Sequence, residues 1–375
     1  MSDIYEDNTR QIKRTGVVGA GLMGTDISIL LAEAGYNVVL IDIDPEALEN
    51  ARREHAQVAE ERGFSLSEDL PGINYSTDIN DLRDSDFVVE AIPEDLELKR
   101  DLMVSIEGVV DEETVIGTNT SSLTPSGISS RMSHPQRVVL FHFANPALDR
   151  DLLEISGDKA TEEVLQTAIK IGRSIGKEPI VFDRECRAHV LSRMSAAIKC
   201  SATWELTRYE PATIDRAAKN LGFDRGPIEL IDLIGIDVHL STVENLSEVY
   251  GDRFEPPAEI HERMIRMVEE GRLGKKTGEG FFKWDDDRAL IPDTDTDYDI
   301  SPVLVALINE AHRIVEDSIT SRDNVNRVLK LGSGGSVGPF DLLDSFGRDY
   351  VVEKLNERYD QTEAAVFEPA ESLIG

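Results

Sequence analysis

The sequence predicts an α/β Rossmann-type doubly wound sheet followed by mainly α-helical C-terminal domains. Three observations lead to this fold class. A glycine-rich turn follows an apolar strand near residue 20, further apolar strands alternate with helical stretches to about residue 183, and helical patterns dominate after residue 188. A chain of 375 residues is also long enough for two or three separate cores.

The first unit of the sheet is predicted from residues 15–41. Residues 15–18 form a short apolar strand, residues 26–34 have helical periodicity that ends at Gly35, and residues 37–41 form the second strand. A parallel crossover of this kind opens a doubly wound sheet. Later strands are expected at residues 87–91, 115–117, 138–143 and 152–155. The first domain is therefore predicted to span residues 1–183.

Helical patterns define the second domain, predicted at residues 184–285. The expected helices cover residues 194–206, 213–220, 228–250 with a break near Gly235, and 258–270. Residues 226–237 then recur as residues 338–349 with half of the positions identical. Residues 301–375 are therefore predicted to be a second, shortened copy of the helical domain.

Residues 286–300 are predicted to be an acidic, solvated linker between the two helical copies. Alternating aspartates at 293–297 resemble the start of a calcium loop. Tyr298 stands where the turn glycine of such a loop belongs, and Leu304 stands where its closing glutamate belongs. No metal site is therefore expected.

The charge balance narrows the classes of partner. The sequence has 39 Lys and Arg against 72 Asp and Glu, a formal net charge of -33, which disfavours binding to nucleic acid and to anionic membranes. Because 40% of the residues are hydrophobic, the acidic excess indicates a solvated surface rather than disorder. A halophilic setting is a hypothesis, since salt would screen the self-repulsion of such a surface.

Cysteine usage and hydropathy indicate the compartment. Cys186 and Cys200 are too few for a disulfide framework in a chain of this size, so we expect two buried thiols. No segment reaches the length of a membrane span. A cytoplasmic location is expected.

The glycine turn has the sequence Gly19-Ala20-Gly21-Leu22-Met23-Gly24. Such a turn between a strand and a helix lets the backbone approach a pyrophosphate, and the helix N-terminus offers free N–H groups to its charge. Asp42, at the end of the next strand, can accept hydrogen bonds from the adenosine ribose. A carboxylate at this position repels a 2′-phosphate, so NAD is predicted as the cofactor rather than NADP.

His142 and Glu154 are the candidate acid–base pair. His142 ends an apolar strand, where side chains of open parallel sheets face the ligand crevice, and Glu154 lies in a second apolar run. A turn through residues 145–151 could bring the two runs together and place the carboxylate against the imidazole. The other ring nitrogen would then be free to act as a general base. A base beside a nicotinamide is the chemistry of an alcohol dehydrogenase.

Taken in order, these motifs resemble the short-chain L-3-hydroxyacyl-CoA dehydrogenases of fatty acid oxidation, over most of the chain. The matching positions are residues 19–24, 88–99, 119–123, 141–146, Glu154, 226–232 and 274–281. The second helical copy also resembles the duplicated C-terminal domains of longer members of that family.

The resemblance implies roles for individual residues. His142 would be the catalytic base, Glu154 its partner, and Ser121 would contact both the substrate hydroxyl and the nicotinamide side of the site. Asn145 would bind near the nicotinamide ribose, and Glu94 and Lys99 would line the NAD cleft. Together with the glycine turn, the predicted cofactor-binding residues are Gly19, Gly21, Leu22, Met23, Gly24, Asp42, Ala91, Ile92, Glu94, Lys99, Ser121 and Asn145.

The chain departs from the family pattern at two places. Ser192 occupies the position of an asparagine that normally reaches the substrate, and a hydroxyl has fewer donors than an amide. Ser192 is nevertheless expected to bind substrate. The helical arm that helps to hold coenzyme A in the family is shortened here to residues 45–70. Its arginines Arg52, Arg53 and Arg62 either meet phosphates or form an ordinary charged helix face.

The predicted function is reversible NAD-dependent oxidation of an L-3-hydroxyacyl-CoA to a 3-oxoacyl-CoA, in β-oxidation or related acyl-CoA metabolism. One alternative is a dehydrogenase of a free 3-hydroxy acid or sugar acid. The other is an NAD(H)-binding protein with little catalysis, which Ser192 suggests and which the set of Ser121, His142, Asn145 and Glu154 disfavours. For the assembly, a homodimer through the helical domains is favoured, and a monomer with an internal pseudo-dimer is the alternative.

Overall fold

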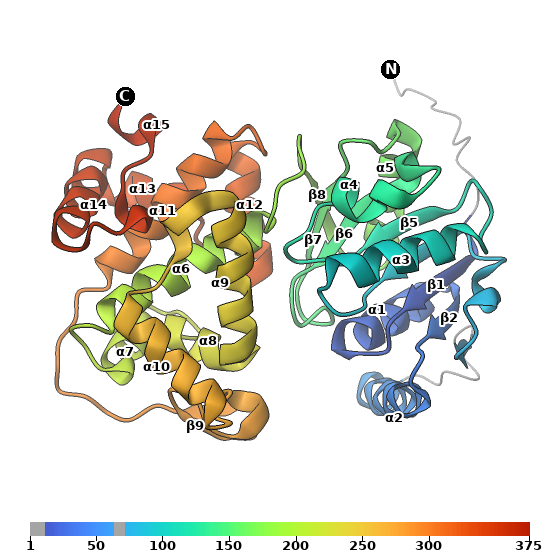
Figure 1. Cartoon of the computed structure of the whole chain (residues 1–375), viewed down its shortest axis with the longest axis horizontal. Helices are drawn as coiled ribbons and strands as arrows, with labels where there is room; N and C mark the ends of the chain where they lie inside the picture. The colour runs from blue at the N-terminus through green and yellow to red at the C-terminus, as the bar shows by residue number, and fades with distance from the viewer. Residues whose placement is uncertain (1–11, 64–71) are drawn as a thin grey trace. The chain divides into compact units, whose positions relative to one another are not determined.

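The computed structural model describes residues 12–63 and 72–375 and divides into two compact units (Figure 1). The first unit contains Met1–Cys186 together with Leu331–Gly334, and the second contains Arg187–Lys330 and Gly335–Gly375. This division falls three residues after the domain end predicted at residue 183. Both helical copies belong to the second unit except for Leu331–Gly334 of the second copy.

An eight-stranded sheet forms the centre of the first unit. Its strands are β1 (Arg14–Val18), β2 (Asn37–Ile41), β3 (Ile73–Ser76), β4 (Phe87–Glu90), β5 (Val115–Thr118), β6 (Val138–Phe143), β7 (Leu152–Ser156) and β8 (Glu178–Val181). They are ordered β3-β2-β1-β4-β5-β6-β7-β8, and every neighbouring pair is parallel except β6 and β7. The predicted doubly wound α/β class is confirmed.

Helices cover both faces of this sheet, and the strands are apolar on both sides for that reason. One face packs against α1 (Leu22–Glu33), α2 (Pro45–Arg62) and α5 (Glu162–Ser174). The other face packs against α3 (Leu96–Glu107) and α4 (Pro125–Ile128). Neighbouring residues alternate between the two cores, as Val17 and Val18 do. Continuous apolar runs are typical of such buried strands.

Strands β3 and β8 were missing from the sequence-based prediction. Both carry mostly half-buried or exposed side chains, because β3 and β8 lie at the two edges of the sheet. They therefore lack the apolar runs by which the central strands were predicted.

The second unit is mainly helical. Its first copy contains α6 (Val190–Glu205), α7 (Pro211–Asn220), α8 (Pro227–Ile234), α9 (Ile236–Tyr250) and α10 (Ala258–Glu269). Its second copy contains α11 (Ser301–Glu316), α12 (Arg322–Ser333), α13 (Pro339–Phe346), α14 (Arg348–Thr362) and the short α15 (Glu371–Ile374). The break predicted near Gly235 separates α8 from α9, where Gly235 has a φ of +99°.

The internal repeat is also a repeat of structure. Asp215 of α7 accepts hydrogen bonds from the backbone N–H groups of Ile228 and Glu229 at the start of α8. In the second copy, Asn326 of α12 accepts from the backbone N–H of Phe340 at the start of α13. Both copies thus satisfy a helix N-terminus with a side chain of the preceding helix.

The segment predicted as a solvated linker, residues 286–300, differs from that prediction. Strands β9 (Lys283–Asp285) and β10 (Arg288–Leu290) form an antiparallel hairpin, so β10 lies inside the segment. Tyr298 and Ile300 are buried in the apolar core of the second unit. The burial of Tyr298 and Ile300 was not predicted, because in this aspartate-rich part of the sequence they are isolated apolar residues and form no apolar run.

The sequence predicts no metal site, no membrane span and no disulfide framework. The structure bears on these three points for the described residues only. Over residues 12–63 and 72–375, no group of three or more His, Cys, Asp and Glu side chains is placed to hold a metal ion. None of the helices within those ranges is long and apolar enough to cross a membrane. Cys186 and Cys200 form no disulfide with each other; both are buried, and burial raises the pKa of Cys200.

Candidate active site

The dinucleotide turn lies between β1 and α1 and depends on glycine at two positions. Gly19 has a φ of +106°, and a Cβ atom there would lie 2.5 Å from the carbonyl oxygen of Ala91. A Cβ atom on Gly24 would lie 1.8 Å from the carbonyl oxygen of Gly19. Larger residues would therefore force α1 away from the sheet.

The N-terminus of α1 is open to a ligand. Gly21 caps the helix without a side-chain hydrogen bond, and a Cβ atom added to it would meet nothing within 4 Å. Leu22 beside it is 59% exposed and Met23 is half-buried. Free backbone donors with open space before them suit a pyrophosphate.

Asp42 completes the cofactor cradle from the end of β2. It is half-buried, and its Oδ2 accepts a hydrogen bond of 2.7 Å from the backbone N–H of Ala20 in the turn. Its Oδ1 accepts from the backbone N–H of Asp44 at 2.9 Å. The carboxylate is thus fixed beside the glycine turn, where it can accept from a ribose hydroxyl and repels a 2′-phosphate. These residues fit NAD.

His142 and Glu154 occupy directly opposed positions of the antiparallel strands β6 and β7. Both side chains are buried, and Nδ1 of His142 lies 2.6 Å from Oε2 of Glu154. Since an ionised carboxylate only accepts, Nδ1–H donates, and this tautomer leaves Nε2 of His142 as an acceptor. The turn between β6 and β7 therefore brings the imidazole of His142 and the carboxylate of Glu154 together, which is the contact expected from the sequence.

Ser121 lies on the Nε2 side of the imidazole, opposite Glu154. It follows β5 in the loop that begins at Asn119, and its Oγ lies 3.2 Å from Nε2 of His142. Ser121 is exposed, whereas His142 is only 6% exposed. A hydroxyl, an imidazole and a carboxylate thus follow one another in a line, with the hydroxyl at the solvent end.

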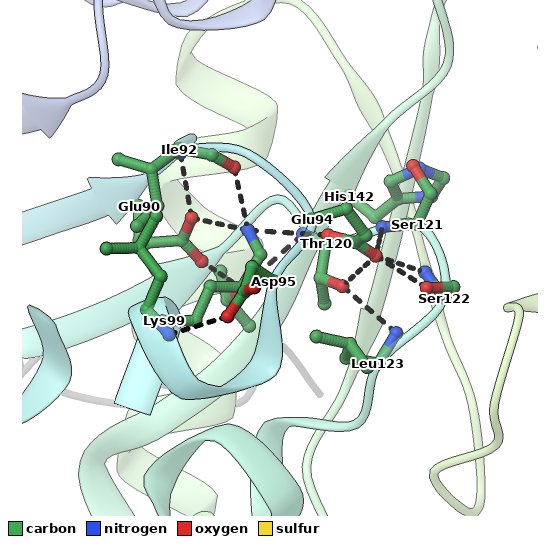
Figure 2. A network of polar contacts seen from close by, with 12 residues as sticks. Glu90, Ile92, Glu94, Asp95, Lys99, Thr120, Ser121, Ser122, Leu123 and His142 are labelled. Carbon is green, nitrogen blue, oxygen red and sulfur yellow. Dashed lines mark hydrogen bonds and ion pairs between the residues drawn. The ribbon is translucent and has the colours of Figure 1, made fainter. Parts of the chain in front are cut away.

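Glu94 and Lys99 lie in a polar network next to Ser121 (Figure 2). Oε1 of Glu94 accepts hydrogen bonds from the 120–122 segment, and its Oε2 lies 3.4 Å from Nζ of Lys99. Lys99 is 1% exposed and donates to Oε1 of Glu90 at 2.6 Å. The structure therefore brings both predicted cleft residues to the loop that carries Ser121.

Ala91 and Ile92 connect this network to the glycine turn. Ala91 N donates to the carbonyl of Val18 at 2.8 Å, and Ile92 N donates to Oε1 of Glu90 at 2.8 Å. The carbonyl of Ala91 is also the atom that restricts residue 19 to glycine. Both residues thus lie at the carboxyl end of β4 beside the cofactor cradle.

Asn145 is exposed in the turn after β6, and the contact that holds this turn was not predicted from the sequence. Asp26 in the dinucleotide helix α1 accepts from the backbone N–H of Ala147 at 3.1 Å. Burial raises the pKa of Asp26 to about 6. The charged side chain of Asp26, in the mostly apolar stretch after the glycine turn, is the feature of the sequence from which this contact could have been predicted.

Asn119 has a supporting role that the sequence also did not reveal. Its Oδ1 accepts a hydrogen bond of 3.0 Å from the backbone N–H of Phe143. The loop of Ser121 is thereby tied to the end of the strand that carries His142.

Two predicted binding elements, Ser192 and the shortened helical arm, have no contact described above with the residues around His142. Ser192 belongs to the second unit, in the first turn of α6, and its part in substrate binding stays a prediction. The shortened arm forms α2, and its predicted end at residues 64–70 lies outside the described residues.

The arginines of α2 contact other protein groups. The Arg52 guanidinium lies 4.2 Å from the ring centre of Tyr75, Arg53 donates to Asn50, and Arg62 pairs with Glu33 at 2.8 Å. These contacts favour an ordinary charged helix face over a phosphate site.

The chain is similar to known proteins over nearly all of its length. The family model described as "3-hydroxyacyl-CoA dehydrogenase, NAD binding domain" matches residues 14–186. The model described as "3-hydroxyacyl-CoA dehydrogenase, C-terminal domain" matches twice, at residues 189–284 and 300–373. The two matches correspond to the two helical copies.

Among curated relatives, the "Fatty acid oxidation complex subunit alpha" of Vibrio parahaemolyticus is 30% identical over 373 residues, covering 92% of this chain and 52% of the relative. The chain thus spans about half the length of the curated relatives that it matches first.

Two solved structures are similar in fold. The 3-hydroxybutyryl-CoA dehydrogenase of Escherichia coli K12 aligns with a TM-score of 0.84 and 23% identity, covering 97% of this chain and 98% of that one. The (S)-3-hydroxybutyryl-CoA dehydrogenase of Ralstonia eutropha has a TM-score of 0.66 and 28% identity, covering 73% of this chain and all of its own (100%). With the family models matching both units, this chain belongs to the 3-hydroxyacyl-CoA dehydrogenase family, whose NAD-binding domain supports NAD as its cofactor.

Proposed function

We propose that this protein catalyses the reversible NAD-dependent oxidation of L-3-hydroxyacyl-CoA to 3-oxoacyl-CoA, in fatty acid β-oxidation or related acyl-CoA metabolism. The observation that carries the proposal is the series of contacts from Ser121 to His142 to Glu154, in which His142 lies near the carboxyl end of β6 and Glu154 lies in the neighbouring strand β7. Family membership and the NAD cradle support the same reaction.

The roles of the three side chains follow from their geometry. Oγ of Ser121 and Nε2 of His142 are 3.2 Å apart. A substrate hydroxyl placed beside Oγ of Ser121 would therefore also lie within reach of Nε2 of His142. His142 accepts the hydroxyl proton at Nε2, while its Nδ1–H continues to donate to Glu154. The imidazolium that forms is stabilised by the buried carboxylate of Glu154. In the reductive direction His142 returns the proton to the carbonyl oxygen.

NAD, when bound in the cradle of Gly19, Gly21, Gly24 and Asp42, supplies the acceptor for the hydride that leaves the substrate carbon. The protein holds this group through backbone donors of the turn and the Asp42 carboxylate. Asn145 and Ser192 are proposed to contact the nicotinamide ribose and the substrate, respectively.

The decisive test compares a thioester with a free acid. NADH oxidation is followed with acetoacetyl-CoA and with acetoacetate, at about 0.1 M and about 1 M potassium chloride, because this change shortens the screening length from about 10 Å to about 3 Å. We expect turnover of the thioester alone, faster in high salt, where the charge of -33 no longer repels an anionic substrate.

Each other outcome identifies an alternative. Turnover of the free acid would favour a hydroxy-acid dehydrogenase. Tight NADH binding without turnover of either substrate would favour a cofactor-binding protein. Equal rates and equal stability at both salt concentrations would contradict the proposed halophilic setting. A cytoplasmic location stays a prediction.

We also propose that the chain is a monomer with an internal pseudo-dimer rather than a homodimer. Helix α6 of the first copy packs on α11 of the second, and buried Arg193 of α6 donates to Glu310 of α11 at 2.7 Å. Buried Arg358 of α14 pairs with Glu205 of α6. Light scattering after gel filtration is expected to give about the 41.6 kDa of one chain, and twice that mass would favour the dimer.

A further inference from the structure

We propose that Asp26 is a positioning residue for the cofactor, which ties the turn that carries Asn145 to helix α1. The inference rests on the proposed function, in which Asn145 contacts the nicotinamide ribose and the N-terminus of α1 meets the pyrophosphate. It gives a task to a buried carboxylate that the proposed reaction does not otherwise use.

Asp26 lies close to the pyrophosphate end of the cofactor cradle. It follows Leu22, the first residue of α1, by four positions, which is about one helical turn or about 6 Å along the axis. Asp26 is only 7% exposed, although carboxylates are rarely buried unless they have a partner. Its partner lies in a segment more than 100 residues further along the chain.

The turn between β6 and β7 supplies the backbone groups that Asp26 accepts from. Within the turn, the carbonyl of Pro146 accepts from the backbone N–H groups of residues 149–150, each at 3.2 Å. The backbone N–H of Ala147 donates instead to Oδ2 of Asp26 at 3.1 Å, and the backbone of Leu148 also forms a hydrogen bond with Asp26. Because Ala147 is fully buried (0% exposed), leaving its N–H unpaired would be costly.

The far end of the same turn is held by different groups. Nζ of Lys177 donates to the carbonyl of Arg150 at 2.8 Å, and the backbone N–H of Glu178 donates to the carbonyl of Asp151 at 2.7 Å. These contacts attach the part of the turn next to β7 to the start of β8. Asp26 holds the part next to Asn145, so removing its carboxylate should loosen that part while the rest of the turn stays attached.

The ionisation of Asp26 sets the conditions of the test. Burial raises the pKa of Asp26 to about 6, the hydrogen bonds with the turn offset part of this rise, and the nearby charges of Glu54 and Asp149 add to it. At pH 7.5 the carboxylate is therefore mostly ionised. A hydrogen bond to an ionised acceptor is roughly twice as strong as one between neutral groups.

The two ends of the cofactor provide a way to separate this role from a general structural one. NADH carries both the pyrophosphate and the nicotinamide ribose, whereas ADP carries the pyrophosphate without the nicotinamide ribose. Loosening the turn of Asn145 should weaken binding of NADH but not of ADP. Removing the negative charge of Asp26 near the pyrophosphate acts on both ligands, so the ratio of their Kd values isolates the contribution of the turn.

The test is a double-mutant cycle with Asp26→Ala, Asn145→Ala and the double variant, measured as Kd for NADH and for ADP at pH 7.5. With Asn145 present, Asp26→Ala is expected to raise the ratio of the NADH Kd to the ADP Kd about fivefold, the effect of about one hydrogen bond. With Asn145→Ala the same change should alter the ratio by less than about twofold, because the positioned group is gone. In steady-state assays, KM for NADH should rise by a larger factor than kcat falls.

Asp26→Asn serves as the conservative variant. Its amide oxygen can still accept from Ala147, so its ratio should lie between those of the wild type and Asp26→Ala, and it carries the cycle if the alanine variant does not fold. Asp149→Ala is the matched control, since it removes an exposed carboxylate from the same turn. Its ratio of Kd values should stay within about a factor of two of the wild type.

A second measurement needs no cofactor. Hydrogen exchange followed by mass spectrometry should be faster in peptides that contain residues 145–148 in Asp26→Ala and unchanged there in Asp149→Ala. A wild type that binds NADH but turns over no 3-oxoacyl substrate would refute the proposed reaction, and a raised Kd ratio in Asp26→Ala would still support the role of Asp26. An unchanged ratio, an equal rise with and without Asn145, or unchanged exchange would overturn the inference.

Discussion

Nδ1 of His142 lies 2.6 Å from Oε2 of Glu154 because the two residues are directly opposed in the antiparallel strands β6 and β7. The pair is buried, and the same register keeps both side chains on one face of the sheet. A shift of one residue would put the carboxylate on the opposite face. The distance is thus set by strand pairing and not by a flexible loop.

We predict that Glu154→Gln lowers kcat by about 100-fold, within the range that general acid–base catalysis contributes. The amide cannot stabilise the imidazolium as a carboxylate does, and it can donate to Nδ1 and so favour the wrong tautomer. Steady-state rates with acetoacetyl-CoA measure the effect, with His142→Ala as the reference. A kcat for Glu154→Gln within a factor of about two of the wild type would contradict the assigned role.

We predict that Asp42→Asn raises the KM for NAD about tenfold. The same change should reduce the preference of the enzyme for NAD over NADP, because the charge that repels the 2′-phosphate is removed. A hydrogen bond to a charged acceptor contributes about 1.5–3 kcal/mol, and about 1.4 kcal/mol corresponds to tenfold in affinity. The asparagine can still accept from the backbone N–H of Ala20, so the glycine turn should keep its shape. Initial rates with each cofactor test this. An unchanged cofactor preference would show that the Asp42 charge is not what excludes the 2′-phosphate.

We predict that Arg193→Met destabilises the protein by about 3 kcal/mol, the low end of the cost of removing one partner of a buried ion pair, because Arg253 still lies 3.7 Å from Glu310. Arg193 is fully buried (0% exposed), and its guanidinium contacts Glu310 at 2.7 Å and Asp317 at 2.9 Å. Urea unfolding followed by circular dichroism measures the change. The double variant Arg193→Met/Glu310→Leu should recover part of the loss, and a double variant less stable than Arg193→Met would contradict this account.

We predict that His239→Leu stabilises the protein by about 1–3 kcal/mol at neutral pH, the cost of a buried unsatisfied polar group. His239 is 3% exposed, and over the described residues neither ring nitrogen has a hydrogen-bond partner. Burial, with the nearby charges of Lys199 and His261, lowers the pKa of His239 to about 3.

The pH dependence of this effect has a definite sign. Between pH 6.5 and about 3 the unfolded state binds the His239 proton and the folded state does not, so this site contributes a loss of stability as pH falls below 6.5. The advantage of His239→Leu should therefore grow by about 1.4 kcal/mol per pH unit over that window. Urea midpoints at pH 7.5 and 5.5 measure it, and an advantage that stayed constant would argue against a buried neutral imidazole.

Much of the fold follows from local pattern. Apolar runs such as residues 138–143 identify the central strands, because a strand covered by helices on both faces must be apolar on both sides. Gly235, at the break between α8 and α9, is visible for a different reason, since its positive φ is rarely adopted by other residues. Edge strands β3 and β8 were not predictable in this way, because solvent on one side relaxes the demand for apolar residues.

The sequence by itself determined the sheet class, the glycine turn, the acidic residue at the end of β2 and the identity of the His–Glu pair, because each is encoded in a short stretch of chain. Only the tertiary structure decided which groups surround Ser121 and the turn of Asn145. Glu94 meets the loop of Ser121, and Asp26 meets the turn of Asn145, across separations of 27 and 121 residues. Hydrogen bonds between distant segments leave no period or spacing in the sequence, so folding alone brings them together.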